Sequence, residues 1–270
     1  MITEQNKDLE QFKFLQEYDK ESVLKYIGAL HLYKANSSFA SRLSRLTIQT
    51  LLNCCGDKLV NDSFGAQIVD NYTFEMSEDP QEFLFVDTVH STRKTYRVFP
   101  GIFSNLQDNL TRYFSIAFNN KINEESLKYS LFFLHVSEYI AEQIGYNNHE
   151  IGEPLEDSMF FPSTNEVKGM ESVYIYDYQN IINIAKLYNI SEEEFNDLLY
   201  LHNDELLKAF DEDMLGYSPV ETNPLYKLSN GQILVIQPSA LLSAAHYYAI
   251  NVLYDRLENF DSIYNDELTL

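Results

Sequence analysis

The spacing of apolar residues is close to the helical period through most of the chain. This spacing predicts helices over about 3–34, 37–54, 104–118, 124–144, 177–188, 191–210 and 239–260, and a short helix that begins at Ser163. Polar residues from Asp19 to Ser22 interrupt the first segment, which therefore forms either one helix or two. The segment at 124–144 is apolar on most sides and is expected to be the central helix.

Two regions instead predict β-hairpins. Within 82–99, β-branched and aromatic residues form two short runs around a polar turn. Within 225–236, two apolar runs flank Asn230-Gly231, a pair typical of a two-residue turn in which both residues have positive φ. We therefore expect a predominantly helical α+β fold with two short hairpins.

Several residues mark helix ends. Ser163 with Glu166, and Ser191 with Glu194, have the spacing of capping boxes, in which each side chain bonds the other residue's backbone amide. Gly56 follows the second predicted helix, and we expect it to adopt the left-handed conformation that commonly ends a helix.

One long segment has no periodicity and suggests a boundary. Residues 147–163 contain one glycine and two prolines among acidic residues. This segment divides the chain into a helical region with a hairpin, 1–146, and an acidic helical region, 164–270. The alternative is that both regions pack as one domain.

Charge is distributed unevenly along the chain. The formal net charge is −22, and residues 1–135 carry −3 of it while residues 136–270 carry −19. Nucleic-acid binding needs clustered Lys and Arg, and the 19 present are spread along the chain, so direct contact with DNA or RNA is not expected. The same charge disfavours anionic membranes and favours a basic protein partner.

Other features of the sequence predict a cytoplasmic protein. No apolar stretch reaches the roughly 18 residues of a membrane span, and the first residues do not resemble a secretory signal. Cys54 and Cys55 are adjacent, so a disulfide between them would be strained, and we expect reduced thiols.

Common catalytic motifs are absent from the sequence. It contains no Walker loop, Rossmann glycine pattern, Gly-x-Ser-x-Gly elbow, His-Glu-x-x-His zinc helix or paired Cys-x-x-Cys. We expect no cofactor. A non-catalytic role is favoured, although an enzyme with a site assembled from distant segments stays open.

Two His-x-x-Glu pairs are candidate metal ligands, because each places an imidazole and a carboxylate one helical turn apart. They are His135 with Glu138, extended by Glu142, and His202 with Glu205. A metal-dependent hydrolase or nuclease would require the two helices to face each other. Such pairs also arise by chance in an acidic helical protein, and solvated helix faces are the simpler interpretation.

A second candidate site would bind a small anion or nucleotide. Ser41, Arg42 and Arg45 lie at the predicted start of a helix, where backbone amides favour anions, and Arg97 lies in the first hairpin. Pairing of these arginines with the acidic half of the chain is an equally good interpretation.

Two further features favour contact with a partner. An apolar run lies in the proline-flanked loop before residue 163, where it either docks on a partner or folds back onto the core. An acidic triplet near the predicted end of the helix at 191–210 opposes the helix dipole, so local stability does not explain it. The residues concerned are Met159, Phe160, Phe161, Asp211, Glu212 and Asp213.

Together these features predict a non-catalytic protein-interaction or regulatory module of a cytosolic, bacterial-type protein. The expected partner is a protein, and a basic one fits the charge best. The chain would be either a whole protein or the N-terminal part of a larger multidomain protein. A metal-dependent hydrolase or nuclease and a small-anion or nucleotide sensor are the alternatives.

Overall fold

The computed structural model describes residues 12–33, 46–71, 86–90, 95–100, 106–146, 162–199, 219–238, 240–260 and 262–263. The helices are η1 (Lys13–Glu17), α2 (Lys20–Tyr33), an unlabelled stretch at 46–53, α4 (Phe64–Asn71), α5 (Leu106–Asn119), α6 (Lys128–Tyr146), α7 (Thr164–Tyr174), α8 (Tyr178–Leu187), α9 (Glu192–Asp197), α11 (Pro219–Thr222) and α12 (Ala240–Arg256). The strands are β1 (Val86–His90), β2 (Thr95–Pro100), β3 (Ile175–Tyr176), β4 (Leu225–Lys227) and β5 (Ile233–Val235). The predicted class, a predominantly helical α+β fold with two hairpins, is confirmed.

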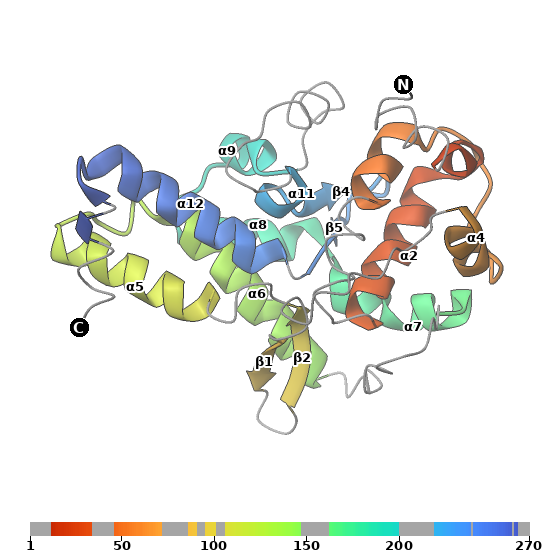
Figure 1. Ribbon diagram of the computed structural model, residues 1–270, viewed down its shortest axis with the longest axis horizontal. Coiled ribbons are helices and arrows are strands. Elements are labelled where there is room, and N and C mark those ends of the chain that lie inside the picture. Colours follow the sequence, from red (N-terminus) through yellow and green to blue (C-terminus); the bar gives the residue numbers. More distant parts are fainter. Residues whose placement is uncertain are drawn as a thin grey trace.

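The central position predicted for the helix at 124–144 is also confirmed. This helix is α6, and it packs against α7, α8 and α12 (Figure 1). Ser130 of α6 is fully buried, and its hydroxyl donates to the backbone carbonyl oxygen of Ala245 in α12 at 2.6 Å. Small residues at this crossing let the two helix backbones approach closely. Phe133 of α6 stacks on Tyr248 of α12. The other fully buried apolar residues of α6 include Phe132, Val136 and Ile140.

The remaining helices gather on either side of α6. On one side α12 also packs against α5, and on the other α2 packs against α7 (Figure 1). Their buried apolar residues belong to one core cluster, whose members range along the sequence from Phe12 to Phe260. Glu21 of α2 also accepts hydrogen bonds from the backbone amide and hydroxyl of Ser229, at 2.6 and 3.0 Å. The boundary proposed at 147–163 lies outside the described residues apart from its last two, and it stays a prediction.

The first hairpin is formed by β1 and β2. The strands are antiparallel, and their register shifts between Asp87 and Thr88, where one strand carries an extra residue. Such bulges bend a two-stranded ribbon and increase its twist. The hairpin predicted at 82–99 is therefore confirmed, with described strands at 86–90 and 95–100.

The second hairpin, β4 and β5, is confirmed with a different turn. Leu228 and Gln232 close a three-residue loop, and the amide of Gly231 donates to the carbonyl oxygen of Leu228 at 2.9 Å. Only Gly231 has a positive φ, 85°, whereas Asn230 does not. The prediction of a two-residue turn with two positive-φ residues was therefore wrong, and the geometry is that of a turn followed by a glycine bulge. The short strand β3 extends this sheet in the order β3-β5-β4.

The capping boxes predicted at Ser163 and Ser191 are present, but the helix that follows Ser191 is shorter than expected. Ser163 and Glu166 cap α7, and Ser191 and Glu194 cap α9, each with both reciprocal bonds. The helix after Ser191 was predicted to reach about residue 210. It ends at Asp197, and Leu199 already forms a parallel bridge with Leu225, the first residue of β4.

Gly56 has a different role from the one predicted. It does not adopt a left-handed conformation, since its φ is not positive. A Cβ atom at this position would instead lie 2.1 Å from the backbone oxygen of Glu17. Close approach of two backbone segments, and not helix termination, is what requires glycine here. The neighbouring Cys54 and Cys55 are free thiols, as expected, with the first buried and the second exposed.

Candidate functional site

Of the predicted metal ligands of α6, His135 contacts another side chain, whereas Glu138 and Glu142 face solvent. His135 is half-buried, and its Nδ1 atom lies 2.9 Å from the hydroxyl oxygen of Tyr188. Within the described ranges, no three His, Cys, Asp or Glu side chains are grouped as metal ligands would be. The partner pair, His202 and Glu205, lies outside those ranges, and the metal site stays a prediction.

The predicted anion-binding and partner-binding residues lie almost wholly outside the described ranges. Of these residues only Arg97 is placed, in β2, where it pairs with Thr88 of β1. Both assignments stay predictions. The residues outside the described ranges are Ser41, Arg42, Arg45, Met159, Phe160, Phe161, Asp211, Glu212 and Asp213.

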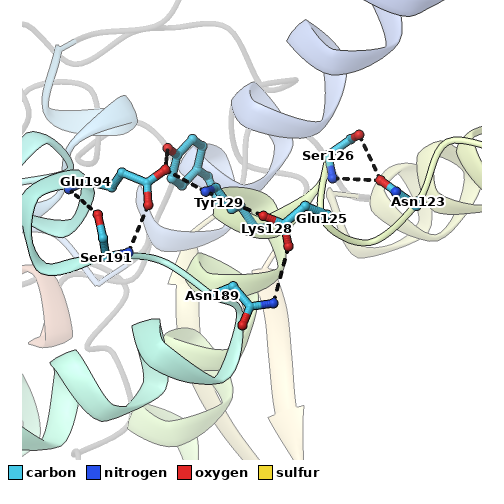
Figure 2. Close-up of polar contacts among 8 residues, drawn as sticks. All are labelled: Asn123, Glu125, Ser126, Lys128, Tyr129, Asn189, Ser191 and Glu194. Atoms are coloured by element: carbon cyan, nitrogen blue, oxygen red, sulfur yellow. Dashed lines mark hydrogen bonds and ion pairs between the residues drawn. The ribbon is translucent and has the colours of Figure 1, made fainter.

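A polar network connects the first turns of α6 and α9. Figure 2 shows that the carboxylate of Glu194 joins Ser191 of its own helix start to Lys128 and Tyr129 of α6. The Oε1 atom of Glu194 accepts hydrogen bonds from the Lys128 ammonium group at 2.5 Å and from the Tyr129 hydroxyl at 2.9 Å. Its Oε2 atom accepts the backbone amide of Ser191 at 2.8 Å, as part of the capping box. Glu194 therefore both begins α9 and attaches it to α6. We call these four residues the Glu194 clasp.

A second set of contacts runs beside the clasp (Figure 2). Glu125, in the turn before α6, lies 3.8 Å from the Lys128 ammonium group and accepts a hydrogen bond from the side-chain amide of Asn189 at 3.3 Å. Asn189 has a positive φ of 57°, because the chain reverses there at the end of α8. The amide of Ile190 donates back to the carbonyl oxygen of Ala185 at 3.1 Å, as in a Schellman motif. The turns that end α8 and begin α6 are thus tied together.

The electrostatics of the clasp keep its groups in fixed protonation states. Hydrogen bonds from Lys128, from the Ser191 backbone and from Tyr129 lower the pKa of Glu194 to about 2. The hydrogen bond to Glu194 raises the pKa of Lys128, and burial together with the same carboxylate raises the pKa of Tyr129. General acid–base catalysis works best with groups whose pKa lies near the operating pH. None of these three groups meets that condition near neutral pH, so the clasp acts as a structural link.

The carboxyl-terminal end of α9 is also anchored. Phe195 is fully buried, and its ring meets those of Phe132 and Tyr178 edge-on, at centroid distances of 6.0 and 5.6 Å. The side-chain amide of the buried Asn223 donates to the backbone oxygens of Asp197 and Leu199, at 3.4 and 3.3 Å. The short helix is therefore fixed at both ends.

The outer side of α9 carries acidic side chains that face solvent. Glu192, Glu193 and Asp197 are all exposed. The Tyr178 hydroxyl donates to Glu192 at 3.0 Å. Within the described ranges, neither Glu193 nor Asp197 forms an ion pair with Lys or Arg, whereas Glu194 pairs with Lys128. The clasp thus neutralises one carboxylate of this helix and leaves the others available.

His246 and Tyr26 are two of the buried titratable groups elsewhere in the described core. His246 of α12 packs against the ring of Tyr113 in α5 at a centroid distance of 4.8 Å, and burial lowers its pKa to about 4. Tyr26 of α2 packs edge-on against Phe64 of α4, and burial raises its pKa above the ordinary range. Both side chains are therefore uncharged at neutral pH.

Lys128 follows the predicted start of the central helix, and the sequence around it does not indicate its partner. Tyr129 and Asn223, which hold the two ends of α9, carried no signal at all. Lys128 and Glu194 are 66 positions apart, and nothing in the local pattern of either residue indicates the other. The capping box did identify Glu194, but only as the start of a helix.

Comparison with known proteins gives no further guide to function. No protein-family model, curated protein or solved structure matches this chain. Among the described helices, none combines the length and apolar character needed to cross a membrane. Residues of this chain alone therefore carry any functional conclusion.

Proposed function

We propose that this chain is a non-catalytic protein-interaction or regulatory module that binds a basic protein partner through the acidic segment beginning at α9. The observation that carries the proposal is the arrangement of α9. The helix is fixed at both ends, its Glu194 is neutralised by Lys128, and its Glu193 and Asp197 stay exposed. A rigid helix with solvent-exposed carboxylates is suited to steer and orient a positively charged surface.

The sequence that follows α9 supports the same proposal. Residues 191–213 contain nine carboxylates and a single lysine, Lys208, and they include the predicted contact residues Asp211, Glu212 and Asp213. A basic partner that contacts α9 would therefore meet a longer run of negative charge. The apolar residues Met159, Phe160 and Phe161 would add contacts that do not depend on salt.

Two further parts of the proposal concern chemistry and location. The Glu194 clasp is proposed as a structural link and not as a catalytic site, because its neighbours lower the pKa of Glu194 and raise that of Lys128. A cytoplasmic location stays part of the proposal, and the free thiols of Cys54 and Cys55 are compatible with it. Contact with nucleic acid is disfavoured by the net charge of −22.

The test is a comparison of two doubly substituted variants with identical charge changes. Glu193→Gln/Asp197→Asn removes two exposed carboxylates from α9. Asp255→Asn/Glu258→Gln removes one exposed carboxylate from the last turn of α12 and one just after it. Each protein is used to capture partners from source lysate at low and moderate salt, with identification by mass spectrometry. A captured partner is then purified and its Kd measured with all three proteins.

We expect the α9 variant to weaken binding by roughly 2- to 30-fold, because each exposed ion pair contributes about 0.2–1 kcal/mol. The α12 variant should bind like the unaltered chain, and the affinity of these two proteins for the partner should fall as salt rises. Equal losses in both variants would show that only net charge matters. A Kd of the α9 variant equal to that of the unaltered chain at every salt concentration would contradict the proposed surface.

A further inference from the structure

We draw no further inference here: the strongest candidate, the buried hydroxyl group of Tyr26 on α2, packed against Phe64 at the start of α4, has no hydrogen-bond partner among the described residues, but its oxygen has almost no accessible surface at which a ligand could bind.

Discussion

At the scale of single residues, Gly56 shows how closely two backbone segments approach in this fold. Glu17, at the end of η1, accepts the backbone amide of Lys58 at 3.1 Å, and the amide of Asp19 donates back to Lys58 at 2.9 Å. These bonds bring the chain around Gly56 onto Glu17, and only a hydrogen atom fits between them. Gly169 of α7 is the opposite case, since a Cβ there would meet nothing within 4 Å.

We expect alanine to have opposite effects at the two glycines. Gly56→Ala should lower the free energy of unfolding by about 2 kcal/mol or more, because its methyl group would overlap the backbone of Glu17. Gly169→Ala should raise it by about 0.5–1 kcal/mol, because alanine is the better helix former. Urea unfolding of both variants measures the difference. A tolerated Gly56→Ala would mean that the two segments are not in contact.

A second residue-scale prediction concerns Lys121, which follows α5 with a positive φ of 62°. The amide of Ile122 donates to the carbonyl oxygen of Ala117 at 2.9 Å, which completes a Schellman motif in which glycine is usually preferred. Lys121→Gly should therefore stabilise the protein by about 0.5–1 kcal/mol. The control is Lys168→Gly within α7, which removes the same charge from an exposed site but should destabilise by a similar amount. A melting temperature that changed in the same direction in both variants would contradict this assignment.

At the scale of elements, the sequence identifies where helices begin better than where they end. Ser163 and Ser191 begin α7 and α9 because each capping box is complete within four residues. The end of α9 is held instead by Asn223, whose side-chain amide donates hydrogen bonds to the backbone oxygens of Asp197 and Leu199. That contact comes from a segment more than twenty positions away, and no pattern around residue 197 reveals it.

The Glu194 clasp can be tested separately from the capping box. Glu194→Gln removes the charge that holds Lys128 but keeps a side chain that can complete the box with Ser191. The control, Glu193→Gln, removes the same charge from an exposed neighbour. We expect Glu194→Gln to lower the urea midpoint and to speed amide exchange in α9, with little change in the control. If the two variants behaved alike, the clasp would contribute nothing to stability.

The clasp also predicts a pH dependence. The folded pKa of Glu194, about 2, lies below its ordinary value of 4.5, so its stabilising contribution is complete above pH 4.5. The contribution is lost as the pH falls from 4.5 towards 2. The difference in free energy of unfolding between Glu194→Gln and Glu193→Gln should therefore be constant near neutral pH. It should disappear as the pH falls from 4.5 towards 2. A difference that persisted below pH 2 would have to come from packing and not from ionisation.

At the scale of the whole molecule, the sequence predicts how much charge the protein carries but not which groups neutralise one another. The net charge of −22 and its concentration in the second half follow from counting residues. Glu194 belongs to the acidic half, yet its partner Lys128 belongs to the other half of the chain. Lys25 of α2 likewise lies 4.0 Å from Glu171 of α7. Only the fold decides which carboxylates remain available to a partner.

The charge of the whole molecule leads to a prediction about salt. Repulsion among excess carboxylates destabilises the compact state, and the screening length falls from about 30 Å at 0.01 M to about 8 Å at 0.15 M salt. We therefore expect the melting temperature to rise over this range, equally in sodium chloride and in choline chloride. A fall would show that attraction within pairs such as Lys128–Glu194 outweighs the repulsion.

A further rise in melting temperature with millimolar Mg²⁺, Mn²⁺ or Zn²⁺ at constant ionic strength would instead indicate a bound ion. That result would favour the metal site predicted from His135, Glu138, Glu142, His202 and Glu205.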